Sequence, residues 1–291
     1  MQVRPLSAEF VAEVDGIDLR HPVSEAAHAA IVEAIDRYAV LVFRDQPLDD
    51  EQQIAFSSLF GPLETTRRAD RPGVTLRLNP HVSDVSNLDE RNRILPTDDF
   101  RRISGLANQL WHTDSSYKRV PARYSLLSAH AVPPAGGETE FADMRAAYDA
   151  LPETRKAEIE DRVAEHSIFT SRAKIGFTDF TPEERAKLPP VPHVMVRTHP
   201  GSSRRSIYVA SHADTVRGMP LPEARLLLME LIEHATQPRF VHRHIWRVGD
   251  LVMWDNRCTM HRGRPYDLTQ IRDMHRTTVS DEVPTVAETA A

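Results

Sequence analysis

Disulfide bonds within the chain are excluded, because its 291 residues contain one cysteine, Cys258. Disulfide-stapled folds belong mostly to secreted proteins, so a lone cysteine fits a reducing compartment. Long apolar runs are missing too. None approaches the roughly 20 residues that a membrane-spanning helix needs, and residues 1–6 lack the apolar core of a secretory signal. We therefore expect a cytoplasmic protein that has no membrane segment.

The sequence also lacks an excess of basic residues. Lys and Arg total 36 against 42 Asp and Glu, which gives a net charge of −6. Nucleic-acid-binding domains are usually basic, so this balance argues against nucleic acid as a partner. The remaining composition, 41% hydrophobic and 27% charged, is that of a soluble globular protein. No repeat or linker divides the chain, and we expect a single domain over residues 1–291; the oligomeric state stays open.

Short strand-like runs dominate the pattern. Runs that are apolar or alternate between apolar and polar residues predict strands at residues 40–43, 109–117, 123–132, 138–141, 194–198, 206–210, 240–246, 251–254 and 271–279. Amphipathic or capped stretches predict helices at residues 24–38, 51–60, 144–150, 152–165 and 222–235. The strands do not alternate regularly with helices, which argues against a parallel sheet. The pattern predicts a mainly β fold with helices, either a β-sandwich or a jelly roll.

One long segment, residues 62–107, shows no regular periodicity and is rich in Arg, Asp, Asn and Pro. Irregular segments of this length inside a compact protein are usually functional loops or lids. The alternative is a disordered surface insertion. We expect loops that cover a site.

Two metal-ligand side chains, His112 and Asp114, lie one residue apart. On an extended strand, residues i and i+2 point to the same face, so the imidazole and the carboxylate would converge. The pair alone is a weak signal, since a second one, His212 and Asp214, occurs in the same chain. For each pair the alternative is a polar turn cap.

A catalytic metal needs a third ligand, and the best candidate is His261. Two histidines and one carboxylate on one side of an ion, with other positions open, are typical of non-haem Fe(II) oxygenases. Among the other histidines, His242 and His244 share a strand face that we interpret as exposed, because no carboxylate is near in sequence. We expect His199 to be structural or to line a pocket.

An oxygenase of this kind needs a co-substrate that supplies electrons. A dicarboxylate such as 2-oxoglutarate requires a cation at its far end, and the planar guanidinium of Arg suits a carboxylate. Arg272 and Arg276 are four residues apart on the last predicted strand, so both face one side while His275 faces the other. Thr139 offers a hydroxyl to the same carboxylate. The alternative for each arginine is an ordinary surface cation.

Three motifs resemble the taurine dioxygenase superfamily. They are NQLWHTDSSY at 108–117, PPAGGETEFADM at 133–144 and VGDLVMWDNRCTMHRG at 248–263. Within the superfamily they are most similar to the 2,4-dichlorophenoxyacetate/2-oxoglutarate dioxygenases. The resemblance covers nearly the whole chain and is weakest across residues 62–104 and 168–190. Substrate-covering loops are therefore expected at residues 62–107 and 168–190.

The resemblance implies a double-stranded β-helix (jelly roll) and an Fe(II) site at His112, Asp114 and His261. It further implies that 2-oxoglutarate chelates the iron, with Thr139 and Arg276 on its distal carboxylate. Family positions that contact the primary substrate correspond to Asn108, Ser116 and Arg272. His212 corresponds to a position that is not a ligand.

The implied reaction consumes O2 and converts 2-oxoglutarate to succinate and CO2. The carbon between the ether oxygen and the carboxylate of an aryloxyalkanoate is hydroxylated, and the product collapses to a phenol and glyoxylate. Two alternatives remain. One keeps the iron chemistry but acts on an alkanesulfonate or sulfate ester; the other is a jelly-roll binding protein without catalysis. Structural metal sites are usually closed by four protein ligands, so a site with three disfavours the second.

Overall fold

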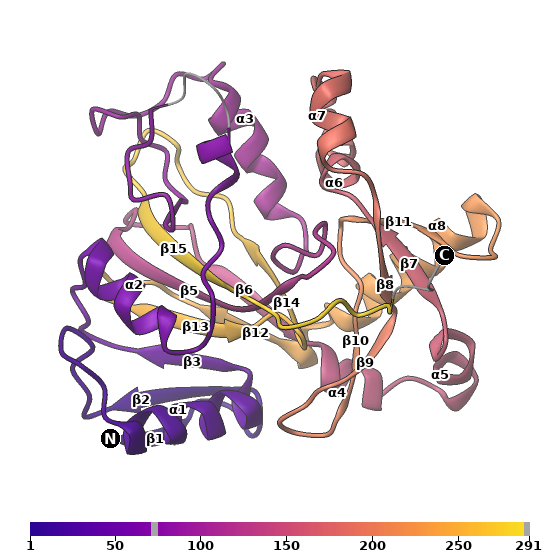
Figure 1. Ribbon diagram of the computed structural model, residues 1–291, viewed down its shortest axis with the longest axis horizontal. Coiled ribbons are helices and arrows are strands. Elements are labelled where there is room, and N and C mark those ends of the chain that lie inside the picture. The colour runs from indigo at the N-terminus through magenta and orange to yellow at the C-terminus, as the bar shows by residue number, and fades with distance from the viewer. Residues whose placement is uncertain (71–74, 288–291) are drawn as a thin grey trace.

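The computed structural model describes residues 1–70 and 75–287, and its largest element is a seven-stranded sheet (Figure 1). In spatial order its strands are β1 (Gln2–Pro5), β2 (Val11–Asp15), β3 (Val40–Phe43), β13 (Leu251–Asp255), β5 (Ala122–Ala131), β15 (Asp273–Ser280) and β4 (Ser83–Asp84). The pairing is antiparallel except between β2 and β3. Strands from both ends of the chain therefore lie side by side, with β13 and β15 flanking β5.

A three-stranded sheet packs against the larger one. It contains β12 (Val241–His244), β6 (Thr139–Asp143) and β14 (Thr259–Gly263), all antiparallel. Phe141 of this sheet is buried in one apolar cluster with Leu127, Trp254 and Met274 of the larger sheet. The two sheets thus enclose a shared core, and the predicted mainly β fold with helices is confirmed.

Helices α1 (Glu25–Tyr38) and α2 (Asp50–Ser58) cover the other face of the seven-stranded sheet (Figure 1). Ile31 and Ile35 of α1 are buried, at the spacing of one helical face. The predicted caps form: Ser24 accepts from a backbone N–H of α1, and Asp49 makes a capping box with Gln52. Local sequence therefore defines both helix starts.

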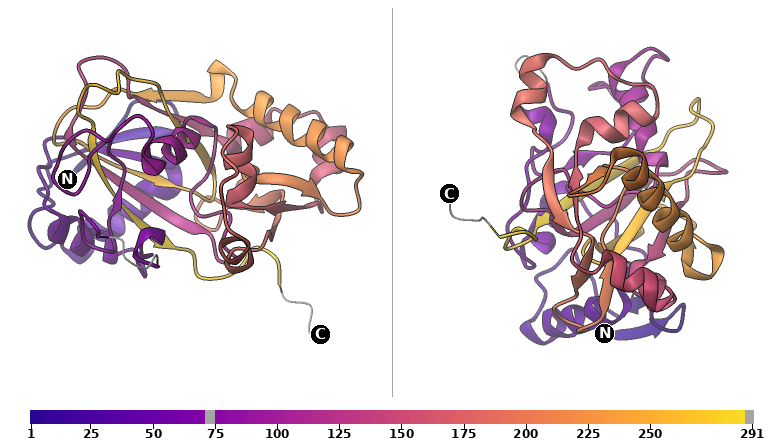
Figure 2. Two further views of the ribbon diagram at one scale, coloured as in Figure 1. Left: turned by 90° about the horizontal axis from the view of Figure 1, so that it is seen from above. Right: turned by 90° about the vertical axis from the view of Figure 1, so that its right-hand side faces the viewer.

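A second apolar cluster lies at the far end of the molecule from α1 and α2 (Figure 2). It packs helices against two small sheets, β8–β7–β11 and β9–β10. The elements are α4 (Met144–Asp149), α5 (Glu153–Ile159), β7 (Val163–His166), β8 (Val191–Val194), β9 (Val196–Thr198), β10 (Arg205–Ile207), β11 (Ala213–Val216), α8 (Leu221–Ala235) and η3 (Pro238–Phe240). None of the helices described, here or elsewhere, has the length and apolar character needed to cross a membrane.

Two predicted elements are wrong. Residues 109–117 do not form a strand: His112 makes a single bridge to His261, and a turn begins at Asp114, with Ser115 at a positive φ of 53°. The predicted helix at 152–165 ends at Ile159, and residues 163–166 become strand β7 between β8 and β11. In both places the local sequence pattern is ambiguous, and pairing with strands distant in sequence determines the backbone conformation.

The two segments expected to cover a site contain only short regular elements. The first holds η1 (Arg67–Asp70), β4, α3 (Phe100–Gly105) and η2 (Leu106–Gln109), and the second holds α6 (Ile168–Lys174) and α7 (Pro182–Lys187). They meet where the rings of Phe100 and Phe177 lie edge to face, 5.1 Å apart. Figure 1 shows α3, α6 and α7 at one end of the two facing sheets.

Candidate metal centre and its cavity

His112, Asp114 and His261 lie together where the β14 edge meets the turn after η2. One possible ligand atom from each lies within 4.8 Å of the others. His112 Nε2 is 4.0 Å from Asp114 Oδ1, and His261 Nε2 is 3.7 Å from Asp114 Oδ2. The antiparallel bridge between the two histidines explains the approach, since it sets their backbones side by side. The three side chains converge through this bridge and the turn, not through the pleat of one strand.

The electrostatics of the cluster suit a divalent cation. Burial lowers the pKa of His112 and of His261, which keeps both imidazoles neutral and able to coordinate. Burial opposes the charge of Asp114, but the positive charge of Arg276 and the hydrogen bond from Ser125 favour it, and the pKa of Asp114 is lowered to about 2. The donor set is therefore two neutral nitrogens and one carboxylate at neutral pH.

The orientation of the ligands also fits a metal. His112 Nδ1 lies 2.8 Å from the carbonyl of Leu110, so Nδ1 carries the proton and Nε2 presents its lone pair to the cluster. Ser125 donates to Asp114 Oδ2 at 2.7 Å. Three protein ligands on one side of an ion leave positions for small molecules, as catalytic sites require.

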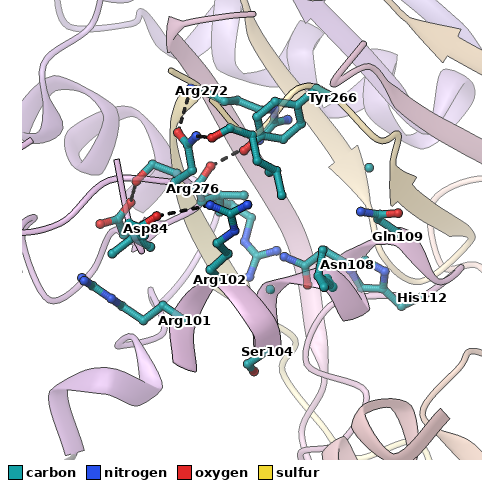
Figure 3. A pocket seen from close by; sticks show the side chains of 18 of the residues that line it. Asp84, Arg101, Arg102, Ser104, Asn108, Gln109, His112, Tyr266, Arg272 and Arg276 are labelled. Atoms are coloured by element: carbon teal, nitrogen blue, oxygen red, sulfur yellow. Dashed lines mark hydrogen bonds between the residues drawn. The ribbon is translucent and has the colours of Figure 1, made fainter. Parts of the chain in front are cut away.

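A cavity of about 330 Å³ opens from the cluster toward α3 (Figure 3). Its wall combines the irregular segments with strands of both sheets. Apolar side chains form much of the wall, among them Leu88, Leu95, Phe100, Leu106, Ile168, Phe180 and Leu268. Both predicted covering segments therefore contribute to one enclosed space beside the metal ligands.

Arg272 and Arg276 both line this cavity, as their shared strand face predicted, but their surroundings differ (Figure 3). Arg276 Nη1 donates to Asp114 Oδ1 at 2.5 Å, which places its guanidinium beside the metal ligands. Arg272 is buried deeper in the wall, where it donates to the carbonyls of Val85 and Gly137 and lies over the Tyr266 ring. His275 points away from the cavity and contacts Asp50, again as predicted.

The three remaining predicted residues are not equivalent. Thr139 lines the cavity, and its hydroxyl oxygen accepts from Trp246 Nε1 at 3.0 Å, leaving its hydrogen to donate. Asn108 also lines the cavity. The Ser116 side chain, by contrast, is fully buried and does not line it, and its Oγ has no hydrogen-bond partner among the described residues.

The other histidines resolve into structural contacts. The ring centroids of His212 and His112 lie 6.1 Å apart in an edge-to-face arrangement, and Asp214 pairs with Arg225, so the side chains of the second His-x-Asp pair point apart. The expectation of an exposed His244 is wrong: this ring is buried and lies 3.1 Å from Asp250, a carboxylate six residues later.

A second cluster of possible ligands is already occupied by a cation. His199, Asp255 and Cys258 lie within reach of one ion, but the Arg257 guanidinium donates to Asp255, and His199 Nε2 donates to the same carboxylate. Burial raises the pKa of the Cys258 thiol, which keeps it protonated. His199 is therefore structural, as predicted.

Sequence reasoning missed residues that complete the cavity. Tyr266 and Trp246 support Arg272 and Thr139, and Phe180 reaches in from the second covering segment. No spacing signal marks them: Tyr266 and Arg272 lie in the irregular connection between β14 and β15, where no helix or strand period applies, and Trp246 is far from Thr139 in sequence.

Comparison with known proteins agrees with this geometry. Residues 2–278 match the family described as taurine catabolism dioxygenase TauD, TfdA family. The chain is 46% identical over 286 residues to the alpha-ketoglutarate-dependent 2,4-dichlorophenoxyacetate dioxygenase of Cupriavidus pinatubonensis, covering 96% of this chain and 97% of that protein. It is 39% identical to the (S)-phenoxypropionate/alpha-ketoglutarate-dioxygenase of Sphingobium herbicidovorans, over 96% and 95% of the two chains.

A solved structure is similar over the same span. The crystal structure of AAD-2 in complex with Mn(II) and N-oxalylglycine, an analogue of 2-oxoglutarate (α-ketoglutarate), has a TM-score of 0.93 and 50% sequence identity. The match covers 99% of this chain and 100% of that one. The chain therefore belongs to the taurine catabolism dioxygenase TauD, TfdA family, and it is an α-ketoglutarate-dependent dioxygenase.

Proposed function

We propose that this enzyme hydroxylates the carbon next to the ether oxygen of a small aryloxyalkanoate and releases a phenol and glyoxylate. The observation that carries the proposal is the guanidinium of Arg276 beside the proposed metal ligands, in a cavity whose wall also carries many apolar side chains. An anionic head next to the reacting carbon and an aromatic ring beyond it match these two features. The relatives that act on 2,4-dichlorophenoxyacetate and (S)-phenoxypropionate support the same class.

His112, Asp114 and His261 are the proposed Fe(II) ligands. When bound, Fe(II), 2-oxoglutarate and O2 supply the oxidising chemistry. The chain's own residues position the substrate and hold the ligands. Neutral imidazoles and an ionised Asp114 bind the cation without first releasing protons, because their pKa values are already low.

The resemblance implied that Arg276 binds 2-oxoglutarate and that Arg272 binds the substrate. The geometry favours the opposite assignment. In an aryloxyalkanoate, the carbon that is hydroxylated carries the carboxylate, so the cation that binds this group must lie close to the metal. Arg276 meets that requirement through its contact with Asp114. We assign Arg276 to the substrate carboxylate.

The distal carboxylate of 2-oxoglutarate, by contrast, lies at the other end of a five-carbon chain whose C1 carboxylate and C2 keto oxygens would coordinate the metal. Its cation must therefore stand away from the ligands. Arg272 does so: it bonds the carbonyl of Gly137, two residues before Thr139. Its described contacts are carbonyls and a ring rather than a carboxylate, so an anion would offset its buried charge. We assign Arg272 and Thr139 to 2-oxoglutarate.

The apolar wall is proposed to hold the aromatic ring and to exclude water from the reacting carbon. Asn108 faces the cavity and stays a proposed substrate contact. The buried hydroxyl of Ser116 does not line it, and we leave that side chain out of the substrate site. Residues 62–107 and 168–190, which meet at the Phe100–Phe177 contact, are proposed to cover the bound substrate.

The test is phenol and succinate release, measured side by side for phenoxyacetate, both enantiomers of phenoxypropionate, and taurine. Phenol and succinate should appear in equal amounts from phenoxyacetate. One phenoxypropionate enantiomer should react faster, because only one can direct its C–H to the metal while its carboxylate is held. Sulfite from taurine without phenol from any ether would instead assign the enzyme to sulfonates.

A further inference from the structure

The side chain of Asn256 lies against the metal ligand Asp114. Asn256 sits in the turn between β13 and β14, and its side chain is completely buried. Its Oδ1 accepts from the backbone N–H of Asp114 at 3.1 Å and from Trp254 Nε1 at 3.0 Å. Both partners can only donate, so the atom facing them must be the amide oxygen. The amide nitrogen consequently points the other way.

The amide nitrogen of Asn256 begins a chain of hydrogen bonds in which the donor and the acceptor of each bond can be assigned. Asn256 Nδ2 donates to Ser125 Oγ at 2.9 Å, and Ser125 Oγ lies 2.7 Å from Asp114 Oδ2. Because the serine oxygen accepts from the amide, its own hydrogen is free to turn to the carboxylate. A carboxylate that binds a metal is ionised and can only accept, so the serine hydrogen is the one that lies between the two oxygens. The amide thus sets the direction of the bond that holds Asp114.

The same residue joins the segments that carry the ligands. Thr113 Oγ1 donates to the Asn256 carbonyl at 2.8 Å, beside the bond from Asp114 N to the amide oxygen. The turn that contains Asn256 leads directly into β14, which carries His261. One buried amide therefore links the Asp114 turn, strand β5 through Ser125, and the β13–β14 hairpin.

We infer that Asn256, acting through Ser125, is a positioning residue that orients the Asp114 carboxylate for metal binding. The inference rests on the metal site proposed above. Groups that hold metal ligands in this way typically contribute about 10–100-fold to metal affinity. The relevant quantity is therefore the affinity of the metal-free enzyme for Mn(II), which requires neither substrate nor turnover.

The test compares Mn(II) dissociation constants by titration calorimetry for Asn256→Ala and Ser125→Ala. Both should bind Mn(II) about 10–100-fold more weakly than the wild type. Ser125→Ala removes only the bond to the carboxylate and keeps the bond from Asn256 to the Asp114 backbone. It therefore carries the test if Asn256→Ala fails to fold.

The chain offers a matched control pair, Gln53 of α2 and Ser128 of β5, the strand that also carries Ser125. Gln53 is a completely buried amide whose Oε1 accepts from Ser128 Oγ at 2.6 Å, and its Nε2 donates to the carbonyls of Leu126 and His275. Gln53→Ala and Ser128→Ala remove the same chemical groups at similar depth, away from the proposed ligands. They should lower the unfolding temperature and leave Mn(II) affinity within about twofold of the wild type.

The outcomes separate the inference from the function on which it rests. Mn(II) binding that survives His112→Ala would overturn the proposed metal site. Binding that is lost in His112→Ala but unchanged in both Ser125→Ala and Asn256→Ala would overturn only the positioning role. Equal weakening in the Gln53 and Ser128 controls would show a general loss of packing and would overturn it too.

Discussion

Arg276 Nη1 donates to Asp114 Oδ1 over 2.5 Å, so one carboxylate faces both imidazoles of the candidate metal centre and a guanidinium of the cavity. The contact helps to keep Asp114 ionised, since the positive charge of Arg276 lowers its pKa. It also places an anion-binding group where the proposed substrate and metal sites meet. Binding of a substrate carboxylate would give Arg276 a second acceptor there.

The first prediction concerns substitution of the proposed metal ligands. His112→Ala, Asp114→Ala and His261→Ala should each lose most bound iron and all succinate formation, because two remaining ligands hold an ion poorly. Iron content after desalting is the measurement. Asp214→Asn is the matched acidic control, because Asp214 pairs with Arg225 at the surface. Iron retention in the ligand variants together with loss in the control would contradict the assignment.

The two arginines should separate kinetically. Removing the partner of a buried carboxylate typically costs about 2–5 kcal/mol, and about 1.4 kcal/mol is tenfold. Arg272→Ala should therefore raise the KM for 2-oxoglutarate by roughly two orders of magnitude. Arg276→Ala should act mainly on kcat/KM for the aryloxyalkanoate. Steady-state kinetics with each substrate varied in turn is the measurement. A larger effect of Arg276→Ala on 2-oxoglutarate and of Arg272→Ala on the aryloxyalkanoate would reverse the two roles.

His275 predicts a pH-dependent stability. Burial opposes the positive charge of His275, but Asp273 and Asp50 outweigh that effect and raise its pKa from 6.5 to about 9. His130 stacks on the ring of His275, and a positive charge on one of these rings disfavours a charge on the other. Because the pKa of His275 is higher in the folded protein, its charged ring stabilises the fold fully below pH 6.5. This contribution to the free energy of unfolding is lost as the pH rises through about 9. His275→Gln should cost about 1.5–3 kcal/mol at acidic to neutral pH. Urea unfolding should show the difference shrinking above that range; a constant difference would refute the charge argument.

The contact between the covering segments should affect the substrate more than the co-substrate. Phe177 meets Phe100 across the two segments, and such aromatic pairs contribute about 0.5–1.5 kcal/mol. Phe177→Ala should raise the KM for phenoxyacetate by roughly two- to tenfold and leave the KM for 2-oxoglutarate unchanged. Leu226→Ala, a change at an exposed position on α8, serves as the control. An equal rise in both KM values would exclude a covering role specific to the substrate.

The sequence by itself determined the features that depend on local or strongly patterned interactions. Ser24, Asp49 and Thr181 cap their helices, because a cap needs only its own first turn. The apolar run Val40–Phe43 is a buried strand, as its pattern required. His112, Asp114 and His261 were identified through side-chain chemistry and motif resemblance, and the fold brings them together.

Only the tertiary structure decided how these groups are arranged. The ligands converge through a single bridge and a turn, because pairing with β14 and the amide of Asn256 replaces the strand that local pattern favoured. The different positions of Arg272 and Arg276 could not be read from their four-residue spacing. The spacing of two residues in sequence predicts whether they share one face of a strand. Their distances from the proposed metal site depend instead on which strands lie opposite in the fold. For the same reason the Asn256–Ser125–Asp114 chain, whose members come from three separate segments, has no signature in the sequence.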